Sequence, residues 1–252
     1  MAYALKFGSY TLPSAFAVTG DPYEASAMMF KTPRSDGDTA AARYLKGKVI
    51  EVDGGLTNGV GSYSEAGVRT LLDTLMSNLQ GKQNLYAFDD RYYRNTQLLH
   101  ANVSNEIQGY LKIRRVKLAF QTPDPFQYSD TVTTTARVIS ATGQTLSVAT
   151  AGNASAKPVL SITVGGSGAK TLASTMTNST TGEAFTLAGA CVGGDVIVVD
   201  CLNQTVVIST TSRIDMFDGL FWSMSNGSNT ITTAYTAATI TNLSVAHRSR
   251  WY

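Results

Sequence analysis

The residues that could carry chemistry are scattered along the chain and form no recognisable catalytic set. Asp89 and Asp90 are adjacent carboxylates, but neighbouring strand residues point to opposite faces, so a turn is the better interpretation. Neither of the 2 histidines, His100 and His247, has a recognisable nucleophile motif near it. The glycine-rich run 165–170 lacks the spacing of a phosphate-binding loop and is interpreted as a hairpin turn. We therefore expect no catalytic residue and no cofactor, and we predict that the chain is not an enzyme.

The sulfur and basic residues also favour structural roles. Cys191 and Cys201 flank one strand-like run. We expect two free, buried thiols there, and a disulfide across neighbouring strands is the alternative. Without a Cys-x-x-Cys motif, no metal site is expected. The basic residues Lys112, Arg114, Arg115 and Lys117 are interpreted as a solvated or inter-subunit surface rather than a nucleic-acid patch, with Arg114 and Arg115 on opposite faces of a strand.

Aromatic residues near the C-terminus allow a binding function. Trp222, Tyr235 and Trp251, with the neighbouring Tyr252, could form a platform on which sugar rings stack. The alternative is that Trp222 belongs to the hydrophobic core, where large aromatic side chains are usually found. Both interpretations agree with the sequence alone.

Composition excludes several classes of protein. The chain has 252 residues, of which 43% are hydrophobic and 15% charged, and its net charge is +2. A mean hydropathy of -0.02 is typical of a globular chain, and no apolar run approaches the roughly 18 residues needed to span a bilayer. The N-terminal residues lack the pattern of a secretory signal. We expect neither membrane association nor sequence-specific nucleic-acid binding.

A long strand near the middle of the chain organises the first half. In residues 116–120 the apolar side chains occupy even-numbered positions, which predicts a strand with one apolar face. In residues 107–113 the apolar positions are odd-numbered instead. A β-bulge at Arg114-Arg115 would explain this change of phase, and so would a strand that passes from one sheet into another.

This strand ends at Pro123-Asp124-Pro125, where we place a domain boundary. Proline cannot donate a hydrogen bond to a sheet, and the composition changes here. Residues 1–125 hold 14 of the 20 Lys and Arg residues and 12 of the 18 Asp and Glu residues. We therefore predict one domain at residues 1–126 and a second at residues 127–252.

The predicted elements differ between the two domains. Residues 64–80 have apolar side chains at helical spacing, with a capping box from Ser62 to Glu65 and Gly81 after the end, so one helix is expected. The breaker-rich run 31–43 is interpreted as a long loop. After residue 127 nearly ten short strand-like runs, among them GLFWSM at residues 219–224, alternate with Gly-, Asn- or Ser-rich turns, which predicts an antiparallel sandwich or jelly roll. The fold class is therefore mainly β.

Four stretches, taken in order, resemble the siphophage distal tail protein (Dit) family. The first joins RYLKGKVIEVDGG to LLDTLMSNLQGKQNLYAFDDRYYRN, and the second is VKLAFQTPDPFQY. The third comprises GNASAKPVLSITVGG, TTGEAFTLAG and GGDVIVVDCLNQTVVI, and the fourth is the C-terminal run from GLFWSM to SRWY. One departure is Ser225-Asn226-Gly227, where the family more often has Pro-Gly.

The resemblance implies an N-terminal β-sandwich with one helix that assembles into a homohexameric ring, and a galectin-like C-terminal β-sandwich. Such a ring belongs to the virion, at the tail tip, and is made and assembled in the host cytoplasm. Its implied partners are the tail tube protein, a tail-tip hub or fibre protein and the tape-measure protein. Under this resemblance, Pro123, Asp124 and Pro125 are the hinge between the domains. The alternatives are a carbohydrate-binding module for host recognition and a hydrolase of the tail tip.

Overall fold

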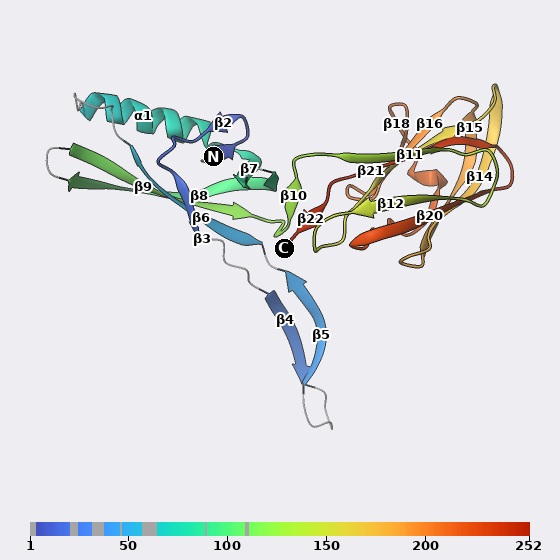
Figure 1. Ribbon diagram of the computed structural model, residues 1–252, viewed down its shortest axis with the longest axis horizontal. Helices are drawn as coiled ribbons and strands as arrows, with labels where there is room; N and C mark the ends of the chain where they lie inside the picture. The colour runs from blue at the N-terminus through green and yellow to red at the C-terminus, as the bar shows by residue number, and fades with distance from the viewer. Residues whose placement is uncertain are drawn as a thin grey trace. The chain divides into compact units, whose positions relative to one another are not determined.

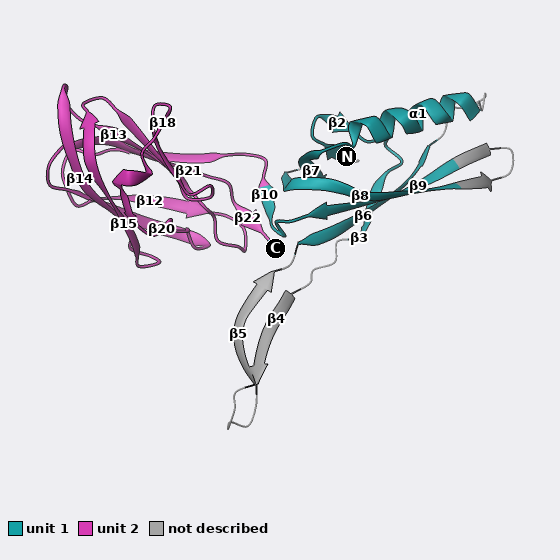
Figure 2. Ribbon diagram, turned by 180° about the vertical axis from the view of Figure 1, so that it is seen from behind, with its two compact units in different colours: residues 1–128, 252 teal, residues 129–251 magenta. Residues whose placement is uncertain are grey.

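The structure is a computed structural model. It describes the backbone of residues 4–20, 25–31, 38–45, 47–56, 65–88, 90–108 and 111–252, and their side chains except those of 25–31, 38–45, 88, 105–108 and 111–113. The chain divides into two compact units, residues 1–128 with Tyr252 and residues 129–251, which Figures 1 and 2 show. The predicted fold class is confirmed, because the described chain is mainly β with one α-helix and several antiparallel sheets.

The first unit is built on one antiparallel sheet with the strand order β2-β1-β7-β8-β9-β6-β3. Its strands are β1 (Lys6–Phe7), β2 (Tyr10–Thr11), β3 (Ala17–Gly20), β6 (Lys48–Leu56), β7 (Lys82–Phe88), β8 (Arg91–Gln108) and β9 (Leu111–Thr122), and β10 (Gln127–Ser129) pairs with β8. The apolar alternation predicted for residues 116–120 is confirmed, since Val116, Leu118 and Phe120 are all buried. The core of this unit lies between the sheet and a helix, where the resemblance implied two facing sheets.

Two further strands correct the expected loop at residues 31–43. β4 (Ala25–Lys31) and β5 (Asp38–Leu45) pair with each other in a separate antiparallel sheet. The prediction was wrong for residues 38–43 because the breakers cluster at the start of the run, and the short Ala-rich remainder shows no clear alternation. Residues 32–37 lie outside the described part of the chain.

The predicted helix is α1 (Glu65–Asn78), and Gly81 follows it with a φ of 78°, as expected for a glycine after a helix end. Val68, Leu75 and Leu79 are buried, whereas Leu71 is 39% exposed. At about 100° per residue, Leu71 lies roughly 60° from Val68 and so falls at the edge of the apolar stripe. Among the described helices, none has the length and apolar content required to cross a membrane. Ser62 lies outside the described residues.

The bulge predicted at Arg114-Arg115 is not there. The pairing of β9 with β6 and β8 runs through these residues without a change of register. The ladder between β8 and β9 shifts instead between Leu98 and His100. The phase of the apolar residues was therefore a poor guide to the pairing of β9, and the side chains of residues 107–113 lie outside the described part of the chain.

A close approach of a loop to the sheet explains one glycine of the first unit. Phe16 is part of the hydrophobic core, and a Cβ added to Gly54 on β6 would lie 2.4 Å from the Phe16 ring. Only glycine therefore leaves room for this ring against the strand. Gly54, the first glycine of the GG dipeptide in the run RYLKGKVIEVDGG, therefore has a packing role.

The second unit is a sandwich of two antiparallel sheets, confirming the prediction from its short strand-like runs. The sheet orders are β11-β21-β13-β16-β17-β18 and β12-β20-β14-β15-β19. The strands of these sheets are β11 (Thr133–Val138), β12 (Gln144–Thr150), β13 (Val159–Val164), β14 (Ala169–Asn178), β15 (Glu183–Val192), β16 (Val196–Asp200), β17 (Thr205–Ile208), β18 (Thr211–Ser212), β19 (Phe217–Gly219), β20 (Gly227–Tyr235) and β21 (Ile240–His247). The short strand β22 (Arg250–Trp251) belongs to neither sheet.

One expected strand of the second unit, residues 219–224, is wrong. The chain there passes from a 3-10 helix, η1 (Ile214–Met216), into the short strand β19, and then runs without ladder pairing until Met224 forms an isolated bridge with Ala156. Trp222 and Met224 are both fully buried. The segment GLFWSM therefore supplies side chains to the core, and this burial produced its strand-like apolar pattern.

Candidate functional site

The Pro-Asp-Pro turn, residues 123–125, lies within the first unit and connects β9 to β10. Asp124 holds the turn together. Its Oδ1 accepts a hydrogen bond from the backbone N–H of Phe126 at 3.1 Å, and its carbonyl accepts one from the Thr122 hydroxyl at 2.9 Å. The Tyr128 hydroxyl donates to the other carboxylate oxygen of Asp124. The turn is thus fixed by side-chain hydrogen bonds in addition to its prolines.

The residues after the turn also pack within the first unit. The Tyr128 ring is buried and stacks on Tyr92 with 6.0 Å between ring centroids. The Arg94 guanidinium lies 5.3 Å from the centroid of the Tyr128 ring, a cation–π distance. Gln127 Nε2 donates to the Tyr93 hydroxyl at 2.7 Å. The predicted hinge residues are therefore part of a well-bonded segment, and their hinge role stays a prediction.

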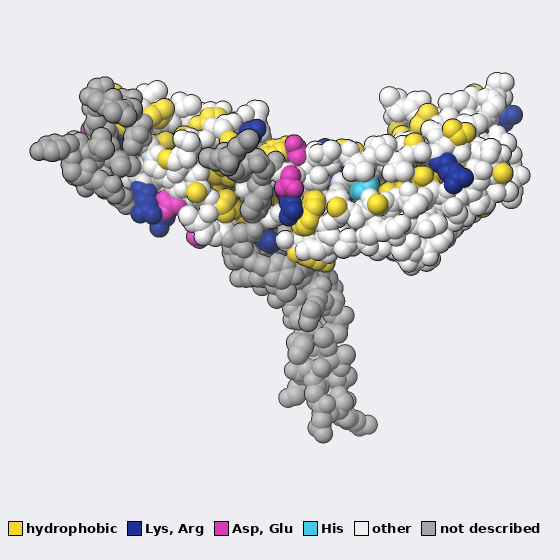
Figure 3. Space-filling view, viewed as in Figure 1, with side chains coloured by type: hydrophobic (Ala, Val, Ile, Leu, Met, Phe, Trp, Pro, Cys, Tyr) yellow, Lys and Arg dark blue, Asp and Glu magenta, His cyan; other side chains and the backbone are white. Residues whose placement is uncertain are grey.

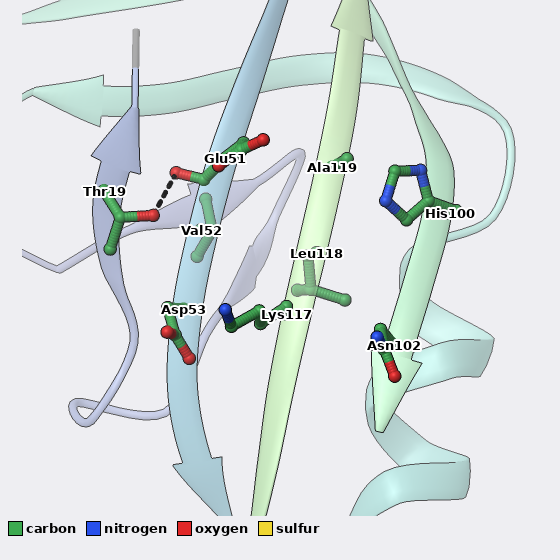
Figure 4. A pocket seen from close by; sticks show the side chains of 9 residues that line it. All are labelled: Thr19, Glu51, Val52, Asp53, His100, Asn102, Lys117, Leu118 and Ala119. Carbon is green, nitrogen blue, oxygen red and sulfur yellow. Dashed lines mark hydrogen bonds between the residues drawn. The ribbon is translucent and has the colours of Figure 1, made fainter. Parts of the chain in front are cut away.

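A polar pocket of about 200 Å³ lies on the outer face of the first sheet, as Figure 4 shows. The residues that line it include Thr19 on β3, Glu51 and Asp53 on β6, Lys117 on β9, and His100 and Asn102 on β8. The alternation of the strands places these polar side chains opposite the buried apolar ones that face the helix. The pocket could receive a polar group, but its mixed charges define no nucleophile and base at hydrogen-bonding distance.

Ion pairs neutralise two residues of the predicted basic cluster. Arg115 Nε donates to Asp53 Oδ1 at 3.0 Å, and Arg115 Nη2 donates to Oδ2 at 2.7 Å. These bonds, together with the nearby charge of Lys117, hold the pKa of Asp53 below its ordinary value. Arg114 points to the helix side and lies 3.4 Å from Glu65. Arg114 and Arg115 thus occupy opposite faces, as predicted, and each has an acidic partner.

A second depression, of about 550 Å³, lies between the end of α1 and the irregular part of β8. Met76 and Leu79 line it from the helix, and residues 97–101 line it from the strand. The register shift at this point turns Leu99 outward, where 53% of its surface is exposed. Sequence reasoning missed this site because it placed the irregularity in the wrong strand.

The three aromatic residues proposed for glycan stacking have different environments. Trp222 is fully buried, with its ring centroid 5.7 Å from that of Phe185 in the core of the sandwich. It therefore cannot present a face to a sugar, and its alternative assignment to the core is the correct one. Tyr235 is half-buried and packs against the same core, and Trp251 on β22 is half-buried.

The cysteines are free thiols, in agreement with the expectation, and both are buried. Burial raises the pKa of Cys201 to about 12 and also raises the pKa of Cys191. Both thiols are therefore protonated at neutral pH and poorly reactive. Among the described residues, no three His, Cys, Asp or Glu side chains come together as a metal site requires. Asp89 and the side chain of Lys112 lie outside the described part of the chain.

Comparison with known proteins defines the class. Residues 151–251 match the family model described as the C-terminal domain of the siphovirus-type tail component. This match covers most of the second unit, residues 129–251. No curated protein sequence matches the chain.

A similarity of fold covers both units. The crystal structure of SPP1 Dit, described as a paradigm of the hub adsorption apparatus in phages that infect Gram-positive bacteria, matches with a TM-score of 0.76 at 15% identity, covering 99% of each chain. The baseplate of phage P2, in its activated conformation with calcium, matches with a TM-score of 0.46 at 10% identity, covering 97% of this chain and 90% of the other. The resemblance to the distal tail protein family is therefore confirmed by the family model over residues 151–251, and the fold of both units is that of SPP1 Dit.

Proposed function

We propose that this chain forms a homohexameric ring at the distal end of a phage tail. In this role the ring joins the tail tube protein to the tail-tip hub or fibre proteins and surrounds the channel for the tape-measure protein and DNA. The observation that carries the proposal is the shared fold with SPP1 Dit over 99% of both chains, together with the family match of residues 151–251. A structural role without catalysis agrees with the polar pocket, whose charged residues form no catalytic pair.

We further propose that the first unit, residues 1–126 in the prediction, forms the ring and that the galectin-like second unit lies at its periphery. The helix covers only one face of the first sheet, and the other face carries charged residues such as Glu51, Asp53 and Lys117. A half-covered sheet with charges of both signs supports contact with a neighbouring subunit, because opposite charges can pair across the interface.

Imaging of the purified full-length chain by negative-stain electron microscopy tests the ring. We expect six-fold particles with a central hole, and a hexamer mass by light scattering at the same concentration. A chain that stays monomeric up to its solubility limit would overturn the proposal of autonomous ring formation. A ring of another symmetry would overturn the hexamer and leave a ring-forming role.

A pair of charge reversals tests which unit forms the ring. Lys117→Glu places a third acidic side chain beside Glu51 and Asp53 on the open face of the first sheet, and we expect it to weaken the ring. Lys170→Glu makes the same change in charge on β14 of the second unit, and we expect it to leave the ring intact. The reverse result would assign ring formation to the second unit.

A further inference from the structure

One edge of the second unit is open. β11 is the outermost strand of its sheet, and it pairs with β21 from Thr133↔His247 to Val138↔Asn242 without a change of register. Native proteins usually protect such an edge with a lysine, a proline or a bulge, because unpaired backbone groups invite another strand. The run TTTARV contains no lysine, proline or bulge, and its one charged residue is Arg137.

β11 also extends beyond the core of the sandwich. Five of its six residues are exposed and Thr135 is half-buried, so neither face of the strand is covered. The edge strand of the other sheet, β12, instead alternates between exposed and buried residues. Val132 and Val138, at the two ends of β11, are 46% and 73% exposed. A regular strand with so little burial is stabilised mainly by its pairing with β21.

The hydrogen-bond phase shows which backbone groups face the open edge. The Ile139 N–H donates to the Thr241 carbonyl at 2.9 Å, which continues the ladder between β11 and β21. In an antiparallel pair, the residues that bond across the ladder alternate with those that point away. Thr133, Thr135 and Arg137 therefore bond to β21. The N–H and C=O groups of the even-numbered residues 134, 136 and 138 point to the open edge.

The side chains along this edge are uncharged except for one. Arg137 is turned toward the other sheet, where its guanidinium donates to the Thr145 carbonyl. The side chains of Val132, Thr134, Ala136 and Val138 lie on one face of the strand by alternation. An uncharged, extended edge with small and β-branched side chains fits another strand of the same kind.

We propose that β11 pairs antiparallel with β11 of a second copy of this chain, around a two-fold axis at Thr135. In this register Val132 lies opposite Val138 of the second copy, and Thr134 lies opposite Ala136. The outward-facing backbone groups of the two strands then meet, and Arg137 lies opposite Thr133, so no like charges oppose each other. If the register shifted by one residue, the backbone groups that face the open edge of one strand would lie opposite residues whose backbone groups face away, and they could not form hydrogen bonds.

The expected strength of the contact follows from its size. The six residues of β11 extend over about 20 Å. A contact along one strand of this length buries a small area, which is typical of weak, transient contacts rather than permanent dimers. The pairing is strengthened when several copies are held together, because the second contact is then intramolecular. It needs only two chains and does not depend on the proposed ring.

Cysteine cross-linking of the full chain tests the register. Thr135 would face Thr135 of the second copy in a non-hydrogen-bonded pair, at a Cα separation of about 4.5 Å that a disulfide spans. Thr135→Cys is therefore expected to give a covalent dimer under mild oxidation. Thr133→Cys is the matched control, because the two copies of residue 133 would lie roughly 13 Å apart. Both native cysteines are buried, which keeps the background low.

Two changes made in the Thr135→Cys chain test the contact itself. Ala136→Pro removes an N–H that points to the open edge, so the fold is kept while the dimer yield should fall about tenfold. Val138→Lys changes an exposed side chain and should lower the yield at least about threefold by placing charge beside Val132. Three results would each overturn the proposal. They are equal cross-linking of the 133 and 135 variants, no cross-linking of Thr135→Cys, and an undiminished yield with Val138→Lys.

Discussion

The two units of this chain cover their β-sheets in different ways. In the first unit, α1 packs on one face of a single sheet, and the other face carries paired charges such as Arg115 and Asp53. In the second, two sheets cover each other around a continuous core that includes Trp222. On the side drawn in Figure 3, charged side chains are sparse on the second unit. The first unit thus presents a polar sheet face, whereas the second is closed on its inner faces and open at an edge.

Buried polar groups sharpen this difference. In the second unit, Asn178 and Asn229 are fully buried and bonded to each other at 3.3 Å, and Asn229 also bonds to the Ser225 backbone. His247 is also buried, with 3% of its surface exposed. Substitutions inside the second unit should therefore have larger effects than those on the sheet face of the first.

The largest effect is expected for Trp222→Ala. Removing this fully buried ring leaves a cavity beside Phe185, so the second unit should lose about 3–5 kcal/mol of unfolding free energy. Chemical denaturation followed by the fluorescence of Trp251, the other tryptophan, measures this loss. The helical circular-dichroism signal of α1 should keep its midpoint because the helix belongs to the first unit.

Trp222→Phe is the matched control for this prediction. It keeps an aromatic ring, and the indole N–H that it removes has no hydrogen-bond partner among the described residues. We expect a loss of no more than about 1.5 kcal/mol. Equal effects of the Ala and Phe variants would contradict a packing role for the ring.

The next largest effect concerns the polar turn of the second unit. Asn229→Ala removes the acceptor of the Ser225 N–H at 2.9 Å and the donor to the Ser225 carbonyl at 2.8 Å. Because these groups are buried, we expect a loss of about 2–3 kcal/mol, measured by the same denaturation. A loss below about 0.5 kcal/mol with Ala would show that the turn does not depend on this side chain.

Much of this architecture could be predicted because it depends on local periodicity. The apolar stripe of α1, the alternation of residues 116–120 and the repeated short strands each reflect one face packed against a core. GLFWSM was misread as a strand for the same reason: Trp222 and Met224 alternate as strand residues do, but no ladder accompanies them. Periodicity reports burial, and hydrogen-bond pairing has to be inferred separately.

Contacts between distant residues could not be predicted in this way. Arg115 and Asp53 are separated by 62 positions, and only the antiparallel register of β6 and β9 brings them together. The irregularity beside Leu99 was missed because the consecutive apolar residues Leu98 and Leu99 give no alternation from which a register shift could be placed. The exposed edge of β11 could not be inferred either, since TTTARV reads as an ordinary strand until its neighbours are known.

The hinge prediction compares the turn at residues 123–125, near the end of the first unit, with a proline inside the second unit. Replacing Pro123 and Pro125 with Gly should lower the unfolding free energy by about 1–2 kcal/mol, because glycine increases the conformational entropy of the unfolded chain. We also expect a broader distribution of inter-unit distances, measured with spin labels, while ring particles persist in electron micrographs. Pro158→Gly in the second unit is the control and should leave the distances unchanged. Loss of the ring would assign the turn to an assembly interface, and unchanged distances would contradict a hinge.

A pH dependence below about pH 6.5 is expected for the second unit because of His247. Burial lowers the pKa of His247 below its ordinary value of 6.5. As pH falls below about 6.5, the unfolded chain binds a proton that the folded unit does not, so stability falls by at most about 1.4 kcal/mol per pH unit. The fall ends once the pH is below the folded-state pKa. His247→Gln should remove this slope, whereas His100→Gln, on the exposed sheet face, should keep it. A slope that survives His247→Gln would assign it to another group.

The smallest effect is expected on the sheet face of the first unit. Asp53→Asn weakens the pair with Arg115, whose side chain is 46% exposed, so the first unit should lose no more than about 1 kcal/mol. Because the pKa of Asp53 is lowered in the folded state, the ion pair contributes to the stability of the first unit above about pH 3.8. This contribution is lost as pH falls through the folded-state pKa. Denaturation followed by the α1 signal at low and high salt measures it. Asp73→Asn, on the exposed side of the helix, is the control. A loss above about 2 kcal/mol would mean that this face is covered in solution, which a subunit contact across the open sheet would explain.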